Sequence, residues 1–323
     1  MAIEKTPLTT GQVRVAVVGA GDVGRGWAAL CVAQGWPVSM YDRRAAIVED
    51  ACDEATRRAR SLSLLRRADT DTVEAGIRQL TRARSMLQAC SDAQWVIESG
   101  PEDLNTKQQI FEAIESSAGK AKAITSSTSG LAASAIAARC LRRDRCFIVH
   151  PMNPPELIPL VEIVPGPETT PGTVELTKGW LRALGRVPVV IRKQVPGAVA
   201  NRIAAAVWRE AIDLVLNGVI DVDDLDRAVS VGPALGWAAA GPHLTYHLGA
   251  GERGVAGFLQ HLLTTFEAVW EDLPTWSKLE PEEQRRLVGK IEQAYKEQVG
   301  VIRPARDKRL AGILWGLERA KEL

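Results

Sequence analysis

The sequence predicts an α/β protein, with a Rossmann-type, doubly wound and mostly parallel sheet followed by an all-helical C-terminal domain. Three observations support this fold class. Short β-rich runs alternate with helix-length segments over the first two thirds of the chain, which is typical of parallel βαβ units. A glycine-rich turn follows the first of these runs. After Pro196 and Gly197, the sequence has the pattern of helices alone.

Seven runs have the composition of strands in this sheet. Each is short and rich in apolar and β-branched residues. Helix-length segments separate most of them, so we expect the strands to be largely parallel. The runs are residues 13–19, 37–42, 94–99, 122–127, 146–150, 160–164 and 187–191.

The remaining third is predicted to be helical. The first helix begins near Asn201 and ends at Gly218, which is a typical helix stop. Asp221 is a suitable N-cap for the next helix. A length of 323 residues is sufficient for two domains. We therefore expect two domains, the Rossmann-type domain over residues 1–194 and the helical domain over residues 195–323.

The composition indicates an ordinary soluble globular protein, which we expect in the cytoplasm. Hydrophobic residues make up 46% and charged residues 24% of the chain, and the net charge of +1 argues against nucleic acid as a partner. No apolar run approaches the roughly 18 residues that a membrane span needs, and the polar N-terminus lacks a signal core. The five cysteines are scattered without metal-ligand spacing, so we expect reduced thiols and no metal site.

A G-x-G-x-x-G turn predicts a dinucleotide site near the N-terminus. In such a turn the first glycine permits the tight bend, the second lets the backbone approach a pyrophosphate, and the third lets the helix pack on the strand. The N-terminal amides of the helix then face the pyrophosphate. The residues expected to bind the cofactor here are Gly19, Gly21, Asp22, Val23 and Gly24.

Asp42 ends the second predicted strand and favours NAD as the cofactor. An acidic residue at this place accepts hydrogen bonds from the adenosine ribose and repels a 2′-phosphate. Arg43 and Arg44 follow it directly. They could pair with a 2′-phosphate, stack on the adenine or face solvent, and the sequence leaves these alternatives open.

The stretch "HPMNPPELIPLVEIVPG" contains a candidate catalytic pair. His150 ends one predicted strand, and Glu162 lies inside the next apolar run, where a carboxylate is costly to bury without a partner. If the two strands are neighbours, Glu162 can orient the imidazole, and His150 can act as the base for an alcohol proton. The alternative is that His150 only ends a strand and Glu162 pairs with an arginine.

Several further motifs resemble one enzyme family. They are "GAGDVGRGWA", "PEDLNTKQQIF", "SSTSGL", "HPMNPPELIPLVEIVPGPET", "PGAVANRI" and "GPHLTYHLGAGERG". Together they resemble the 3-hydroxyacyl-CoA dehydrogenase superfamily, and within it the branch of L-gulonate 3-dehydrogenase (lambda-crystallin) and carnitine dehydrogenase. The resemblance implies a homodimer. It also implies catalytic roles for Ser129, His150, Glu162 and Asn201, and cofactor contacts from Glu102, Lys107 and Asn153.

The sequence departs from this branch at one position. Gulonate-type and carnitine-type relatives commonly carry an arginine where this chain has Gly236, before Trp237. If that arginine binds a substrate carboxylate, this chain lacks a strong anchor for one. We therefore expect a bulkier or less charged hydroxy compound, in a pocket to which Trp237, Tyr246 and His247 could contribute.

The expected function is that of an NAD-dependent oxidoreductase that removes a hydride from the secondary alcohol of a 3-hydroxy acid or a related small 3-hydroxy compound. One alternative is a true 3-hydroxyacyl-CoA dehydrogenase, because an arginine cluster lies where such enzymes bind coenzyme A. A second alternative is a non-catalytic, crystallin-like structural protein. The arginines of the cluster near the coenzyme A site of such enzymes are Arg57, Arg58, Arg60, Arg66 and Arg67.

Tryptophans 208, 270 and 315 in the helical part favour a homodimer.

Overall fold

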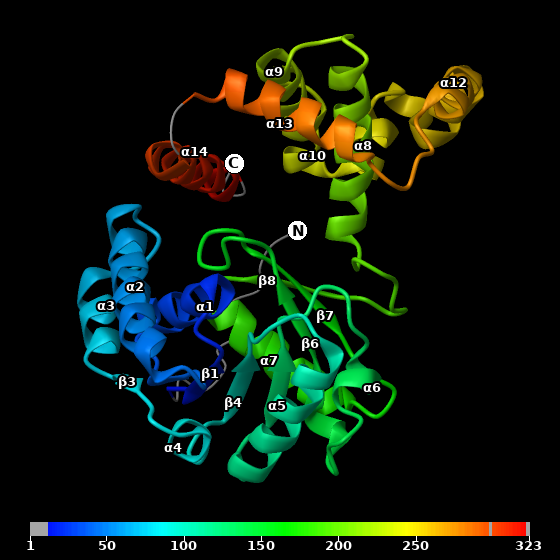
Figure 1. The fold of residues 1–323 in the computed structure, drawn as a ribbon. Coiled ribbons are helices and arrows are strands. Elements are labelled where there is room, and N and C mark those ends of the chain that lie inside the picture. Colours follow the sequence, from blue (N-terminus) through cyan, green and yellow to red (C-terminus); the bar gives the residue numbers. More distant parts are fainter. Residues whose placement is uncertain (1–11, 297–298, 321–323) are drawn as a thin grey trace. The chain divides into compact units, whose positions relative to one another are not determined.

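The computed structural model describes residues 12–296 and 299–320 of the chain. The polar N-terminal stretch, residues 1–11, lies outside this range. The chain divides into two compact units (Figure 1). The first comprises the residues up to Val199 together with Asp307–Gly312, and the second comprises Ala200–Arg306 and the residues from Ile313 onward.

The first unit is built on an eight-stranded sheet with the order β3-β2-β1-β4-β5-β6-β7-β8. All neighbouring strands are parallel except β6 and β7, which are antiparallel. This confirms the predicted Rossmann-type sheet and its seven predicted strands. The strands are β1 (Val15–Val18), β2 (Val38–Tyr41), β3 (Leu80–Arg82), β4 (Trp95–Glu98), β5 (Ala123–Ser126), β6 (Cys146–Pro151), β7 (Leu160–Val164) and β8 (Val187–Val190).

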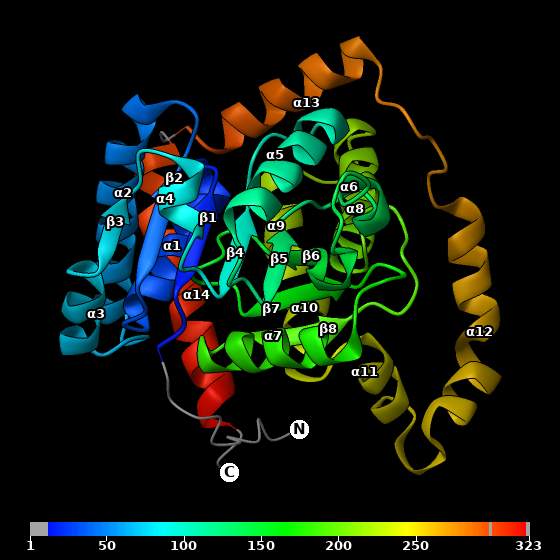
Figure 2. The same ribbon diagram turned by 90° about the horizontal axis from the view of Figure 1, so that it is seen from below.

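Helices cover both faces of the sheet because side chains alternate along each strand. Val15 and Val17 belong to the core shared with α1, α2 and α7, whereas Ala16 and Val18 belong to the core shared with α4, α5 and α6. In Figure 2, α5 and α6 lie on one side of the strands and α7 on the other. The helices are α1 (Asp22–Ala33), α2 (Ala45–Leu64), α3 (Thr70–Ile77), α4 (Met86–Cys90), α5 (Leu104–Ser117), α6 (Ala133–Ile136) and α7 (Pro171–Ala183).

The second unit is helical in its described part, as the sequence predicts. Its first helix ends before Gly218, whose φ of 72° is the left-handed conformation that suits glycine after a helix. Helix α13 contacts α8 and α9, and α11 contacts α12. The helices are α8 (Ala200–Leu216), α9 (Val222–Val231), α10 (Pro233–Ala240), α11 (Pro242–Leu248), α12 (Gly254–Asp272), α13 (Pro281–Ala294) and α14 (Val299–Arg319), of which Asp307–Gly312 belong to the first unit.

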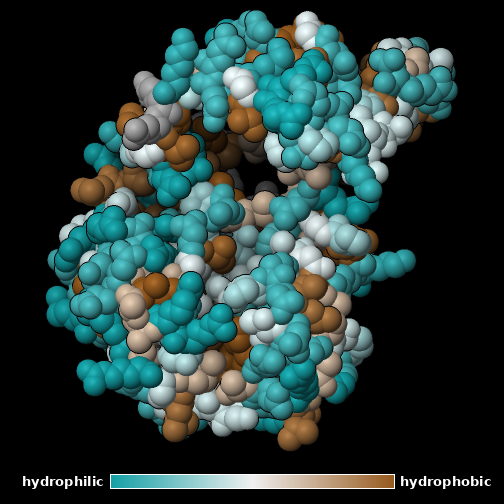
Figure 3. Space-filling view, in the orientation of Figure 1, coloured by the Kyte–Doolittle hydropathy of each residue, from teal (hydrophilic) through white to brown (hydrophobic). Residues whose placement is uncertain are grey.

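Across residues 12–296 and 299–320, no helix is long and apolar enough to cross a membrane. Within the same ranges, no group of three or more His, Cys, Asp or Glu side chains is arranged to hold a metal ion. In Figure 3, hydrophilic side chains cover most of the visible surface, and apolar side chains appear in separate patches.

Candidate active site

The turn between β1 and α1 has the backbone geometry that a dinucleotide site requires. Gly19 has a φ of 109°, and a Cβ on this residue would lie 2.5 Å from the carbonyl oxygen of Ser99. A Cβ on Gly24 would lie 2.0 Å from the carbonyl oxygen of Gly19, so only glycine allows α1 to pack this closely on the turn. Gly21 instead has nothing within 4 Å of its Cβ position. The turn therefore has no space for a side chain at Gly19 or Gly24, whereas the space at the Cβ position of Gly21 is open, and a pyrophosphate would approach there.

The N-terminus of α1 offers amide groups for that pyrophosphate. Its N-cap is Gly21, and no side chain caps the helix there. The first-turn amides of a helix have no partner within the helix and carry the positive end of its dipole. The residues of the β1–α1 turn thus fit a bound dinucleotide by shape and by charge.

Asp42 is held rigidly at the end of β2. Its Oδ2 accepts a hydrogen bond from the backbone amide of Ala20 at 3.1 Å, and its Oδ1 accepts one from the amide of Arg44 at 3.0 Å. Burial opposes ionisation of Asp42, but these hydrogen bonds outweigh it and hold the pKa of the carboxyl below its usual value. The Arg44 side chain is exposed and lies 3.4 Å from Asp42, and Arg43 is exposed as well. The residue after β2 is therefore a fixed carboxylate.

His150 and Glu162 lie directly opposite each other in the antiparallel pair β6–β7. The imidazole Nδ1 is 3.0 Å from Glu162 Oε2, and both side chains are buried. The other carboxylate oxygen, Oε1, accepts a hydrogen bond from the amide of Val199 at 2.9 Å. A carboxylate only accepts, so Nδ1 carries the proton in a neutral imidazole and Nε2 remains as an acceptor.

The pair lies at the same edge of the sheet as the glycine turn. Strands β1, β4, β5 and β6 run parallel, so their carboxyl ends share one edge. His150 is near the end of β6, and Gly19 directly follows β1. This edge is where doubly wound sheets bind their ligands.

Ser129 lies beside His150. Both residues line a small recess together with Thr128, Leu131 and Val195. Ser129 itself is exposed. A hydroxyl and an imidazole therefore border one space at the ligand-binding edge of the sheet.

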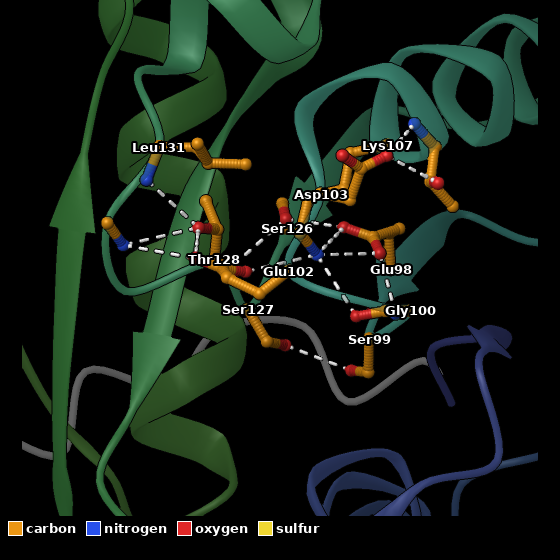
Figure 4. A network of polar contacts seen from close by, with 12 residues as sticks. Glu98, Ser99, Gly100, Glu102, Asp103, Lys107, Ser126, Ser127, Thr128 and Leu131 are labelled. Carbon is orange, nitrogen blue, oxygen red and sulfur yellow. Dashed lines mark hydrogen bonds and ion pairs between the residues drawn. The ribbon is translucent and has the colours of Figure 1, made fainter.

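A buried charge network reaches this recess through Thr128, which belongs to both (Figure 4). The Lys107 ammonium is bonded to both carboxylate oxygens of Glu98, at 2.9 and 3.0 Å, and to the carbonyl of Gly100 at 3.2 Å. Glu98 and Lys107 are fully buried, whereas the Glu102 carboxylate is half exposed and lies 3.6 Å from the ammonium. Lys107, which the sequence placed among the cofactor contacts, therefore has its charge paired inside the first unit.

The same network shapes the loop that carries Ser129. Ser126 Oγ donates to Glu98 at 2.5 Å and accepts the amide of Thr128 at 2.9 Å. The Thr128 hydroxyl donates to Glu102 and accepts the amide of Leu131 at 3.1 Å. Sequence reasoning did not identify Glu98. A glutamate at the end of the apolar run "WVIE" was the available signal, because a buried carboxylate needs a cationic partner.

The remaining predicted residues lie outside this cluster or in the second unit. Asn153 is exposed in the link between β6 and β7, after Pro151. Asn201 is in the first turn of α8, which belongs to the second unit. Gly236 and Trp237 are in α10, in the second unit as well.

The arginines of α2 make ion pairs within the first unit. Arg57 lies 2.5 Å from Glu54, and Arg60 makes a bidentate pair with Glu74 of α3 at 2.8 and 3.2 Å. Arg58 also pairs with Glu54, at 2.7 Å. These three guanidinium groups are thus partly or wholly neutralised by carboxylates.

A glycine turn, a fixed ribose-side carboxylate and a buried histidine–carboxylate pair on one doubly wound sheet define a dinucleotide-dependent dehydrogenase. Comparison with known proteins agrees. Residues 14–195 match the NAD binding domain of 3-hydroxyacyl-CoA dehydrogenase, and residues 197–288 match its C-terminal domain. The chain therefore belongs to the 3-hydroxyacyl-CoA dehydrogenase family, and it is an NAD-dependent oxidoreductase.

Individual relatives place the chain within this family. It is 36% identical to an L-carnitine dehydrogenase of Streptomyces coelicolor over 80% of both chains. It is 34% identical to a 3-hydroxyacyl-CoA dehydrogenase of Gibberella moniliformis over 90% of this chain and 88% of the relative. A solved structure of 5-formyl-3-hydroxy-2-methylpyridine 4-carboxylic acid 5-dehydrogenase, an NAD+-dependent dismutase, is 28% identical with a TM-score of 0.77 and covers 95% of this chain and 99% of that one. The predicted resemblance to the family and to its carnitine dehydrogenase branch is confirmed.

Proposed function

We propose that this chain oxidises the secondary alcohol of a free 3-hydroxy acid, or of a related small 3-hydroxy compound, with NAD+ as the acceptor. The observation that carries the proposal is the pair His150–Glu162, with Nδ1 and Oε2 3.0 Å apart at the cofactor edge of the sheet. Oxidation of an alcohol needs a base for the hydroxyl proton, and an oriented neutral imidazole supplies one.

In this reaction, the proposed base is His150. Its Nε2 takes the proton of the substrate hydroxyl, while the hydrogen on the carbon that bears this hydroxyl leaves as hydride. Glu162 holds the ring through Nδ1 and stabilises the imidazolium that forms, as the carboxylate does in other histidine–carboxylate pairs. Glu162 is itself fixed by the amide of Val199. NAD+ supplies the hydride acceptor when it is bound.

Ser129 and Asn201 are proposed to hold the substrate oxygen and the nicotinamide. This role is supported for Ser129 because Ser129 and His150 line the same recess. A neutral hydroxyl or amide stabilises developing charge without competing for the proton. Of the dinucleotide contacts implied by the resemblance, Glu102 and Asn153 are proposed to complete the cofactor side. Lys107 is proposed to act only through Glu98, because its ammonium is buried and paired with that carboxylate.

The ion pairs of α2 favour a free acid over a coenzyme A ester. A coenzyme A phosphate would have to compete with Glu54 and Glu74 for Arg57 and Arg60. Relatives named L-carnitine dehydrogenase make L-carnitine the first substrate to test. Gly236 has no cationic side chain for a substrate carboxylate, which supports including compounds without a carboxylate among the candidates.

A substrate panel tests the proposal. NADH formation is followed at 340 nm with L-gulonate, L-carnitine, 3-hydroxybutyrate, its coenzyme A ester and aryl-substituted 3-hydroxy compounds. We expect at least one free hydroxy compound to have a higher kcat/KM than the ester. The true 3-hydroxyacyl-CoA dehydrogenase alternative is correct if only the ester is oxidised. Failure of every compound would contradict the proposed substrate class.

We further propose that the active form is a homodimer in the cytoplasm. Large apolar side chains of α12 remain exposed in the described structure, among them Leu259, Val269 and Trp270. Leu259 and Trp270 line an apolar groove of about 770 Å³ between α11 and α12. Apolar surface of this kind on a helical domain is typical of interfaces between subunits. The five cysteines are free thiols, which supports a reducing compartment.

A further inference from the structure

Asp22, the first residue of α1, is expected to bind the pyrophosphate through its backbone amide, but its carboxylate is an unexpected neighbour for an anion. It follows Gly21 directly at the turn that holds the dinucleotide, and its side chain is 55% exposed. A carboxylate in the first turn stabilises a bare helix through the helix dipole. It repels a bound anion at the same place by the same electrostatics. An unpaired Asp22 would therefore oppose cofactor binding.

Arg58 of α2 pairs with this carboxylate. Its guanidinium bonds Asp22 Oδ1, and its Nη1 donates to the backbone carbonyl of Asp22 at 3.3 Å. Nε donates to Glu54 at 2.7 Å, which fixes the guanidinium from the other side. Only 13% of the Arg58 side chain is exposed, so solvent screens the pair with Asp22 less than a surface ion pair.

We propose that Arg58 is a positioning residue of the cofactor site, which neutralises Asp22 and turns its carboxylate away from the pyrophosphate. Arg58 itself then acts through Asp22 and needs no contact with the dinucleotide. This role concerns the cofactor alone and is independent of which hydroxy compound is the substrate.

The same guanidinium also reaches the link between β6 and β7. Its Nη1 lies 3.4 Å from Glu156 Oε1, and Glu156 Oε2 has no hydrogen-bond partner among the described residues. A Cβ on Gly26 of α1 would lie 2.6 Å from Glu156 Oε2, so the link is pressed against α1. Arg58 could therefore also serve only to hold this link, and an experiment must separate the two roles.

Binding of NADH, measured by fluorescence titration in low salt, separates them. In Arg58→Gln the Asp22 charge is uncompensated. We therefore expect the Kd for NADH to rise about tenfold, which corresponds to about 1.4 kcal/mol of binding free energy. In Asp22→Asn/Arg58→Gln there is no charge to neutralise, and we expect the Kd to return to within about threefold of the wild-type value, since a neutral amide repels no phosphate. Arg60→Gln is the matched control, because Arg60 is on the same helix but pairs with Glu74, and its Kd should not change.

Salt provides a second readout. Ions screen charge repulsion, because the Debye length falls from about 10 Å at 0.1 M to about 3 Å at 1 M. The defect of Arg58→Gln should therefore shrink in 1 M NaCl, whereas a defect caused by a displaced link would persist. Thermal melting verifies that each variant is folded. If Arg58→Gln does not fold, Arg58→Lys replaces it, and this variant should bind NADH nearly as the wild type does because it keeps the charge.

Two results would overturn the proposal. One is a Kd for Arg58→Gln equal to that of the wild type. The other is a double variant that binds NADH as weakly as Arg58→Gln alone, since Arg58 would then act through Glu156 and the link. If Arg58→Lys is the variant used, a tenfold loss of NADH affinity would also contradict the proposal, because lysine keeps the positive charge.

Discussion

Glu162 shows at the scale of one residue how burial predicts a partner. A carboxylate between Val161 and Ile163 is too costly to bury alone, so the sequence itself indicates a neighbour that can bind it. The structure places His150 opposite, with 3.0 Å between Nδ1 and Oε2. Glu98 is the same kind of residue, buried at the end of β4, and its partner Lys107 lies in α5. That pair was not predicted, because the sequence indicated Lys107 as a cofactor contact and Glu98 was not identified.

Asp42 determines the expected choice of cofactor. Its carboxylate is fixed by the amides of Ala20 and Arg44 and is ionised at neutral pH. A 2′-phosphate beside it would meet a like charge, and about 1.4 kcal/mol of repulsion corresponds to tenfold in rate. We expect kcat/KM with NAD+ to exceed that with NADP+ by at least about this factor. Steady-state kinetics with both cofactors measure the ratio, and equal values would show that Arg43 and Arg44 outweigh Asp42.

At the scale of elements, the sequence predicts where the strands lie along the chain better than whether neighbouring strands are parallel or antiparallel. All seven predicted strands are present, but the antiparallel pairing of β6 and β7 was not foreseen. The link between them, residues 152–159, is too short for the crossover that parallel strands need, and this was the available signal. Strand β3 was missed because it has only three residues, "LTR", at the edge of the sheet, with little apolar character.

The contact between α1 and the glycine turn gives a prediction at the same scale. In Gly24→Ala the new Cβ would lie 2.0 Å from the Gly19 carbonyl oxygen, so α1 must move away from the turn. We expect a loss of about 1–3 kcal/mol in the free energy of unfolding, typical of overpacking, and a large loss of NADH affinity. Denaturant melts and NADH titration measure these two effects.

Gly289→Ala is the matched control for this change. Gly289 lies inside α13 with nothing within 4 Å of its Cβ position, so alanine should stabilise the helix by up to about 1 kcal/mol. A Gly24→Ala variant that melts and binds NADH like the wild type would contradict the packing assigned to this turn.

For the whole molecule, the sequence predicts the class of enzyme but not its substrate. The order of strands and helices, the glycine turn and the histidine motif are local patterns, and local patterns specify the Rossmann-type unit and the family. A substrate pocket depends on side chains far apart in the sequence, and the proposed contribution of Gly236 and Trp237 of α10 is an example. The pairing of Arg60 with Glu74 also could not be read from the sequence, because Glu74 belongs to another helix.

Assembly is a second property of the whole molecule. The exposed apolar side chains of α12 predict a homodimer, so light scattering at micromolar concentration should give twice the monomer mass of 35.0 kDa. Replacing Trp270, which is 55% exposed, with glutamate should shift the mass toward the monomer. Glu318→Gln, a change at a polar position of α14, should leave the mass unaltered. A wild-type protein of about 35.0 kDa would contradict the proposed interface.

The central claim is that His150, oriented by Glu162, takes the proton of an alcohol whose hydride passes to NAD+. The most direct test is the single-turnover rate of NADH formation in the wild type, in His150→Ala, in Glu162→Gln and in the double variant. His150→Ala should be slower by about 10²–10⁴-fold, the usual contribution of general base catalysis. Because the two residues act as a unit, the double variant should be about as slow as His150→Ala alone, while all four proteins bind NADH equally well. A fully active Glu162→Gln, or losses that multiply in the double variant, would show that Glu162 does not act through His150.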